Sequence, residues 1–183
     1  MADNVTGLIL AGGQSTRFGS DKARHILQER PLIAHVYDAL STAADSVFLS
    51  TGSSSKRYGL PATPIMDLRP QCGPLGGIHA GLVQIDTPWL LVAACDIPFI
   101  QPSDFAKLLE ARSSEVDLVV ARASGRLHPT CACYNKRLLQ RVEAQIDAGE
   151  CALHALLDAA RMKVVDLPSS SLKNINRLSD LPE

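Results

Sequence analysis

The sequence lacks an excess of charge of either sign and lacks any hydrophobic run long enough to cross a membrane. Its 18 lysines and arginines nearly balance 19 aspartates and glutamates, which gives a net charge of -1. A chain without net charge has no overall attraction to nucleic acid or to an anionic membrane surface. We therefore expect neither as a partner, and any anionic ligand must be bound by local cations.

Cysteines are few and show no metal-binding spacing. The chain has five, an odd number, and none forms a C-x-x-C pair. This pattern indicates neither a disulfide framework nor a zinc site. Cys131 and Cys133 stand two residues apart, as do side chains on one face of a strand, so we expect both in the core. The first residues show no signal-peptide pattern, which makes the cytoplasm the expected location.

Length and periodicity predict an α/β fold. At 183 residues, 46% of them hydrophobic, the chain is expected to form one domain over residues 1–183. Short apolar segments alternate with segments of helical period, which predicts a mostly parallel sheet with helices on both faces. The predicted strands are residues 6–10, 46–51, 63–67, 89–94, 118–121, 130–134 and 163–167. The predicted helices are residues 31–43, 77–85, 102–112, 136–148 and 152–161.

A glycine-rich turn carrying two cations follows the first predicted strand. Gly12 and Gly13 lack a Cβ, so a ligand can approach their backbone N–H groups closely. Arg17 offers a planar fork to phosphate oxygens, and Lys22 offers a compact charge on a flexible stem. Neither the Walker spacing nor the dinucleotide spacing fits these glycines. A tight connection would explain the glycines but not the cations, so a triphosphate cradle is the favoured interpretation.

A second polar feature follows the apolar run 89–94, which has the composition of a strand buried on both faces. The next residues are Cys95, Asp96, Ile97 and Pro98. Mg²⁺ is a natural partner for such a carboxylate, since it binds through one or two carboxylates plus substrate phosphates. An aspartate before Ile-Pro also suits a cap of the following turn. By itself this segment supports both interpretations.

The glycine-rich run resembles, at every fixed position, the pattern L-A-G-G-x-S-x-R-[MF]-G-x-x-K of the small nucleotidyltransferases. The resemblance is strongest to the molybdenum cofactor guanylyltransferases. Further motifs of that family follow in the same order: G-P-L-G-G at 73–77, C-D-I-P at 95–98, H-P at 128–129 and N-I-N at 174–176. The sequence departs from the family's usual N-x-N-T-P ending, because Arg177 and Leu178 stand where threonine and proline are expected.

The resemblance implies a Rossmann-like three-layer nucleotidyltransferase fold and transfer of GMP from GTP to molybdenum-loaded molybdopterin, with Mg²⁺ as cofactor. The implied catalytic residues are Arg17, Lys22 and Asp96, with Asp96 as the metal ligand. The implied GTP-binding residues are Leu10, Ala11, Gly12, Gly13, Lys22, Ser50, Asp67 and Asp96. The implied acceptor-binding residues are Gly73, Pro74, Leu75, Gly76, Gly77, His128, Asn174 and Asn176, which we expect at the opposite end of the crevice from the nucleotide.

Other interpretations of the same motifs stay open. A molybdopterin cytidylyltransferase or another small NTP transferase would share the glycine-rich turn and the metal-binding aspartate, although Gly12 favours guanine. A third possibility is a nucleotide-binding accessory protein without turnover. The presence of both Lys22 and Asp96 argues against it, because such a protein would be expected to lose these residues first. Asp67 is also consistent with a solvated strand end, and His128 with a structural turn. Transient contact with molybdoenzymes or their chaperones is a further expectation.

Overall fold

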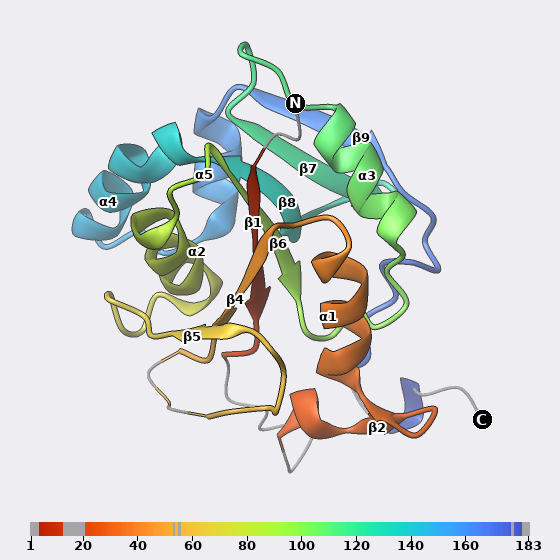
Figure 1. Ribbon diagram of the computed structural model, residues 1–183. Helices are drawn as coiled ribbons and strands as arrows, with labels where there is room; N and C mark the ends of the chain where they lie inside the picture. Colours follow the sequence, from red (N-terminus) through yellow and green to blue (C-terminus); the bar gives the residue numbers. More distant parts are fainter. Residues whose placement is uncertain (1–3, 13–20, 53, 55, 177, 181–183) are drawn as a thin grey trace.

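The computed structural model describes residues 4–12, 21–52, 54, 56–176 and 178–180. A seven-stranded sheet forms its centre, in the strand order β5-β4-β1-β6-β8-β7-β9 (Figure 1). The strands are β1 (Val5–Leu10), β4 (Ser46–Ser50), β5 (Thr63–Ile65), β6 (Trp89–Ala94), β7 (Leu118–Ala123), β8 (Arg126–Asn135) and β9 (Met162–Asp166). Only β8 runs antiparallel to its neighbours in this sheet. The predicted mostly parallel sheet is therefore confirmed.

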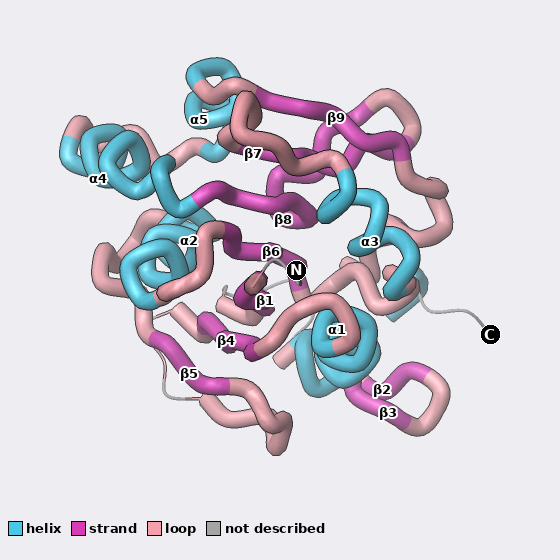
Figure 2. The backbone as a smooth tube through the Cα atoms, turned by 45° about the horizontal axis from the view of Figure 1, so that its top comes forward, coloured by secondary structure: helices cyan, strands magenta, loops and turns pink. Residues whose placement is uncertain are grey.

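Helices cover both faces of the sheet (Figure 2). One face carries α1 (Leu32–Ser41) and α3 (Pro102–Glu110), and the other carries α2 (Gly73–Gln84), α4 (Leu139–Asp147) and α5 (Leu153–Ala159). Alternate residues of a strand point to opposite faces, so Ile9 joins the first hydrophobic cluster and Leu8 the second. Among the described helices, none is long and apolar enough to cross a membrane.

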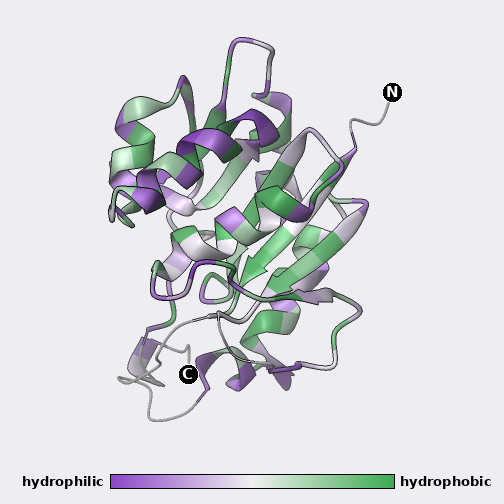
Figure 3. Cartoon of the chain, turned by 90° about the vertical axis from the view of Figure 1, so that its left-hand side faces the viewer, coloured by the Kyte–Doolittle hydropathy of each residue, from purple (hydrophilic) through white to green (hydrophobic). Residues whose placement is uncertain are grey.

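The predicted elements occur, with shifted ends. The strand at 89–94 has the predicted bounds, whereas α2 begins at Gly73 instead of residue 77. Proline is tolerated in the first turn of a helix, so Pro74 lies inside α2. Cys131 and Cys133 are both buried in the same hydrophobic cluster, as predicted. Figure 3 shows the hydrophobic character of the central strands.

Two hairpins lie outside the sequence prediction. The β7–β8 turn is made by Ser124 and Gly125, both at positive φ (48° and 74°), as in the type I′ turns that connect tightly twisted strands. The antiparallel β8 consequently begins at Arg126 and is longer than the predicted 130–134. A small hairpin joins β2 (Ile26–Leu27) to β3 (Arg30–Pro31) through Gln28 and Glu29, also at positive φ. Gln28 and Glu29 are not residues that usually form turns, so nothing in the sequence indicated this hairpin.

The short 3-10 helices of the structure are η1 (Lys22–Arg24), η2 (Lys136–Leu138) and η3 (Leu178–Asp180). The first of these matters for the site described below, because it carries Lys22. Asp21 caps η1 by accepting a hydrogen bond from the Ala23 backbone N–H at 3.2 Å. Such side-chain capping satisfies a helix N–H that has no partner within the helix.

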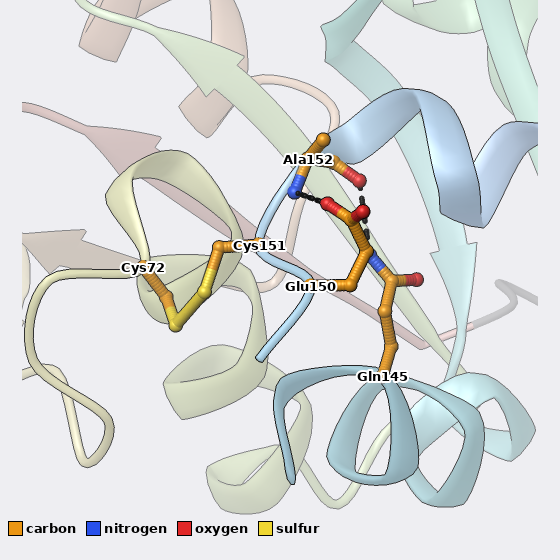
Figure 4. Close-up of a disulfide and its surroundings, with 5 residues drawn as sticks. All are labelled: Cys72, Gln145, Glu150, Cys151 and Ala152. Atoms are coloured by element: carbon orange, nitrogen blue, oxygen red, sulfur yellow. Dashed lines mark hydrogen bonds between the residues drawn. A yellow bond between two sulfur atoms is a disulfide. The ribbon is translucent and has the colours of Figure 1, made fainter. Parts of the chain in front are cut away.

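The expectation that the cysteines form no disulfide is wrong for one pair. Cys72 and Cys151 are bonded across a sequence separation of 79 residues (Figure 4). The bond joins the N-cap of α2 to the connection between α4 and α5. That connection is itself ordered, because Glu150 accepts a hydrogen bond from the Ala152 N–H at 2.8 Å. The pairing depends on tertiary structure that cysteine spacing does not reveal.

We predict that reducing the Cys72–Cys151 bond destabilises the protein. Closing a loop of this length stabilises the folded state by about 4 kcal/mol through the entropy of the unfolded chain. For a chain of this size that corresponds to a fall in Tm of roughly 10 °C. Differential scanning fluorimetry should show this fall on adding a reductant to the wild-type protein. Cys151→Ser should have the lower Tm already without reductant, and adding reductant should not change it. Equal changes in Tm for both proteins would contradict the prediction.

Candidate active site at the ends of the parallel strands

Three parallel strands end side by side at one edge of the sheet. Past their last paired residues, the Ala11 N–H donates to the Ser50 carbonyl at 2.8 Å, and the Cys95 N–H donates to the Leu10 carbonyl at 3.0 Å. The strand order changes direction here, because β4 and β5 lie on one side of β1 and β6 lies on the other. Ligands of open α/β sheets bind outside the carboxyl ends of the strands at such a point.

Lys22 and Asp96 meet at this edge. Lys22 Nζ lies 2.9 Å from Asp96 Oδ2, and the two side chains are 15% and 21% exposed. Lys22 Nζ also donates to Asn176 Oδ1 at 2.6 Å. Three residues that were predicted separately, from three distant segments, therefore share one cluster. A charged pair that is only partly desolvated and still reachable from solvent suits binding of an anionic ligand.

Asn176 is positioned by its buried neighbour Ile175. The Ile175 side chain is fully buried against Leu27 and Leu32, with Phe99 packed beside them. The Ile175 N–H donates to the Asp96 carbonyl at 2.9 Å. The two asparagines on either side are exposed. Asn176, which was expected on the acceptor side, contacts Lys22, which was expected on the nucleotide side, so the two predicted groups of residues meet here.

Ser50 and Asp67 form a second pair at the ends of β4 and β5. Ser50 Oγ donates to Asp67 Oδ1 at 3.1 Å, and the Asp67 N–H donates to the Gly52 carbonyl at 3.1 Å. Burial raises the pKa of the Asp67 carboxyl, while the Ser50 hydrogen bond and the nearby His79 act in the opposite direction. The structure thus brings together two of the predicted GTP-binding residues.

Glycines allow α2 to approach these strand ends closely. A Cβ on Gly77 would lie 2.6 Å from Ser50 Oγ and 2.8 Å from a Leu10 methyl group. A Cβ on Gly76 would lie 3.0 Å from Asp67 Oδ2. Gly76 and Gly77 were predicted as acceptor-binding residues, and the structure places both against Ser50 and Asp67. Gly73 differs from them, since its positive φ of 53° is what requires glycine there.

His128 lies in β8, opposite Ala121 of β7, and not in a turn before the strand as its H-P motif suggested. Burial lowers the pKa of His128, and the nearby Arg126 adds to this, while Asp96 acts the other way. The imidazole is therefore largely neutral at pH 7 and within electrostatic reach of Asp96. This places the predicted acceptor residue on the β6–β8 side of the site.

Sequence reasoning missed a cluster around Tyr58. The Tyr58 hydroxyl donates to both oxygens of Asp21, Lys56 Nζ lies 3.1 Å from Asp21 Oδ2, and the Arg24 guanidinium lies over the Tyr58 ring. Residues 56–60 also line a cavity of about 140 Å³, together with Leu49, Ala62 and Pro64. The run Lys56-Arg57-Tyr58 was the available signal, a basic pair beside an aromatic residue.

Part of the predicted site lies outside the described residues, namely Gly13 and Arg17. Within the described ranges, no group of three or more His, Cys, Asp or Glu side chains could hold a metal ion by itself. Mg²⁺ at phosphate sites needs no such group, since it binds through one or two carboxylates and oxygens of the ligand.

A family model, the MobA-like NTP transferase domain, matches residues 7–164. This range begins within β1 and ends within β9, so it includes at least part of every strand of the central sheet. The chain belongs to the MobA-like NTP transferase family.

Similar proteins cover almost the whole chain. The molybdenum cofactor guanylyltransferase of Desulfosudis oleivorans is 31% identical over 188 residues, which cover 98% of this chain and 93% of that protein. The enzyme of the same name from Vibrio cholerae is 32% identical over 184 residues, with 98% and 91% covered. The crystal structure of molybdopterin-guanine dinucleotide biosynthesis protein A from Archaeoglobus fulgidus superposes with a TM-score of 0.77 at 25% identity, covering 96% and 94% of the two chains. The predicted family and fold are thereby confirmed.

We predict that Gly77→Ala weakens nucleotide binding in this MobA-like domain as well as stability. The added methyl must displace Ser50 Oγ or Leu10, and overpacking of this kind costs about 1–3 kcal/mol. Gly81→Ala is the matched control, because its Cβ would collide with Leu90 and Leu8, away from Ser50. Both variants should melt earlier, but calorimetric titration with GTP should show weaker binding only for Gly77→Ala. Equal GTP affinities of the two variants would rule out the close approach at Ser50 as a binding determinant.

Proposed function

We propose that this protein is a guanylyltransferase that transfers GMP from GTP to molybdenum-loaded molybdopterin and releases pyrophosphate. The observation that carries the proposal is the Lys22–Asp96 contact at the ends of the parallel strands. The names of the similar proteins from Desulfosudis oleivorans and Vibrio cholerae support the choice of guanine and of the acceptor. GTP and molybdopterin are accordingly the proposed small-molecule substrates.

The proposed reaction is an in-line displacement at phosphorus. An oxygen of the acceptor's terminal phosphate forms a bond to the α-phosphorus of GTP. The bond from that phosphorus to the bridging oxygen breaks, and its electron pair leaves with pyrophosphate. Such chemistry depends on positioning and on neutralising charge, so no side-chain nucleophile is required.

Lys22 supplies the cation for the triphosphate in this proposal. Its ammonium group is held by Asp96 and Asn176, so it stands ready at the strand ends without having to be ordered by the ligand. Preorganised charge of this kind stabilises a transition state without reorganisation during the reaction. Arg17 is proposed for the departing pyrophosphate on the basis of its motif position alone.

The oxygen ligands at this site suit Mg²⁺, and we propose Mg²⁺ as the cofactor. Asp96 is the residue that would hold it, because one partly exposed carboxylate beside substrate phosphates is the arrangement that Mg²⁺ accepts. Bound there, Mg²⁺ would supply charge neutralisation to the phosphate oxygens. Lys22 remains within hydrogen-bond distance of the same carboxylate and orients it.

The acceptor is proposed to approach from the side of His128 and Asn174. Burial lowers the pKa of His128, which interacts electrostatically with Asp96, and Asn174 is exposed next to the buried Ile175. Gly73–Gly77 remain in the proposal as a backbone surface at the start of α2. We further propose the cytoplasm as the location and transient contact with molybdoenzymes or their chaperones.

We predict that GTP stabilises the protein more than CTP, ATP or UTP. In the presence of Mg²⁺, a nucleotide at about 100 times its Kd adds roughly 2.7 kcal/mol to the free energy of unfolding. Thermal melting with each nucleotide measures this directly. Incubation with molybdopterin and mass analysis of the dinucleotide product would complete the assignment. A CTP-derived product would instead identify a molybdopterin cytidylyltransferase.

A second prediction separates the roles of the charged pair. Lys22→Ala removes a cation, so it should weaken GTP binding and lower turnover together. Asp96→Asn keeps the shape of the side chain, so the fold and GTP binding should survive while turnover falls by about 10²–10³. Calorimetric titration and a pyrophosphate-release assay measure the two quantities. Near-normal turnover of Asp96→Asn at limiting Mg²⁺ would exclude a metal-binding role for Asp96.

A further inference from the structure

Lys22 lies on a segment that is too short to hold its own shape. The 3-10 helix η1 consists of three residues, Lys22–Arg24, and a single turn of this kind is not stable by itself in water. The Asp21 carboxylate caps it, because Oδ1 accepts a hydrogen bond from the Ala23 N–H at 3.2 Å. Ala23 is buried in the first hydrophobic cluster, so Lys22 stands between a capping residue and a buried one. The direction in which Lys22 reaches Asp96 therefore depends on how firmly Asp21 is held.

The segment between β4 and β5 holds Asp21 through two side chains. The Tyr58 hydroxyl lies 3.2 Å and 3.1 Å from the two carboxylate oxygens of Asp21 and donates to them. Lys56 Nζ lies 3.1 Å from Asp21 Oδ2. Hydrogen bonds to an ionised acceptor are stronger than neutral ones. The Asp21 side chain is only 19% exposed, so water competes weakly for its oxygens and the contacts restrain it.

The same segment also contacts the last residue of η1. The Arg24 guanidinium lies 5.1 Å from the centre of the Tyr58 ring, and Arg24 Nη2 donates to the Arg57 carbonyl at 2.6 Å. The Tyr58 ring packs against the first hydrophobic cluster. A phenylalanine would keep both the packing and the contact with Arg24. Packing therefore accounts for the ring of Tyr58 but not for its hydroxyl, whose partner is Asp21.

We propose that Tyr58 is a positioning residue for Lys22, acting through Asp21 and η1 without touching the nucleotide. The proposal rests on the proposed function, because it takes Lys22 to be the cation that binds the triphosphate. The contacts lead from the Tyr58 hydroxyl to the Asp21 carboxylate and from that carboxylate to the N–H of Ala23. Lys22 lies between these two residues and points its ammonium group at Asp96. A cation that is in place before the ligand arrives binds it more tightly, since less conformational freedom is lost on binding.

Tyr58→Phe tests the proposal by removing only the hydroxyl. The ring stays, whereas Asp21 loses a hydrogen-bond donor and η1 is held less firmly. We expect the GTP dissociation constant to rise about three- to tenfold, which is less than the full loss of a hydrogen bond to a charged group. The effect is smaller because it reaches Lys22 only through Asp21. Calorimetric titration measures it, and an unchanged dissociation constant overturns the proposal.

Tyr37→Phe is the matched control. The Tyr37 hydroxyl, from α1, donates to the Pro61 carbonyl at 3.2 Å. The same atom is thus removed, and a hydrogen bond to the same segment between β4 and β5 is lost, but the contact with Asp21 stays. Tyr37→Phe should leave the GTP affinity unchanged. A loss as large as that of Tyr58→Phe would show that any loosening of this segment weakens binding, which overturns a specific role of the Tyr58–Asp21 contact.

A second readout is whether the effect of Tyr58 depends on Lys22. In a Lys22→Met protein, Tyr58→Phe should change the GTP dissociation constant by less than about twofold, because the residue through which Tyr58 acts is gone. A purely structural role of Tyr58, or a direct contact between Tyr58 and GTP, predicts the same loss of affinity with and without Lys22. Equal losses in the two backgrounds therefore overturn the proposal.

Asp21→Ala provides an independent test and decides the question if Tyr58→Phe does not fold. The change removes the cap of η1 and the acceptor of the Tyr58 hydroxyl together. It also removes a negative charge near the proposed triphosphate, which by itself favours an anionic ligand. Charge and positioning thus predict opposite signs. Weaker GTP binding by Asp21→Ala supports the proposal, and unchanged or tighter binding overturns it.

The outcomes separate this proposal from the proposed function. If Lys22→Met binds GTP as tightly as the wild-type protein, the assignment of Lys22 to the nucleotide site fails, and the positioning role fails with it. If Lys22→Met weakens binding while Tyr58→Phe and Asp21→Ala do not, only the positioning role is wrong. In that case the contacts of Lys22 with Asp96 and Asn176 suffice to place its ammonium group.

Discussion

The contact between Lys22 and Asp96 is the interaction on which the site depends. It joins the segment after the glycine-rich turn to the end of β6, and through Asn176 it includes the C-terminal segment. The burial of Ile175 fixes that segment independently, since its side chain packs under the β2–β3 hairpin and its N–H binds the Asp96 carbonyl. One cation thus has two oxygen partners, which come from separate parts of the fold.

A second constraint is the closeness of α2 to the ends of the strands. Gly76 and Gly77 leave room for Asp67 and Ser50, and any side chain there would displace one of them. The Cys72–Cys151 bond holds the beginning of the same helix. The glycine-rich motif of this region therefore serves packing as well as any ligand contact.

Much of the fold was predictable because buried strands are short, apolar and separated by helical periodicity, as at Trp89–Ala94. Residues that follow strand ends, such as Asp96, could be assigned to one edge by the geometry of parallel sheets. The position of Asn176 could not, because it depends on a hairpin whose turn, Gln28-Glu29, contains no usual turn residue.

The central claim is that the cluster of Lys22, Asp96 and Asn176 binds the nucleotide as one unit, and a double-mutant cycle on Lys22 and Asn176 tests it most directly. GTP dissociation constants would be measured for Lys22→Met, Asn176→Ala, the double variant and wild type. We expect a coupling free energy of about 1 kcal/mol or more, because either single change already breaks the contact that positions the ammonium group. Losses that add to within about 0.5 kcal/mol would show that the two residues act independently and would contradict this account.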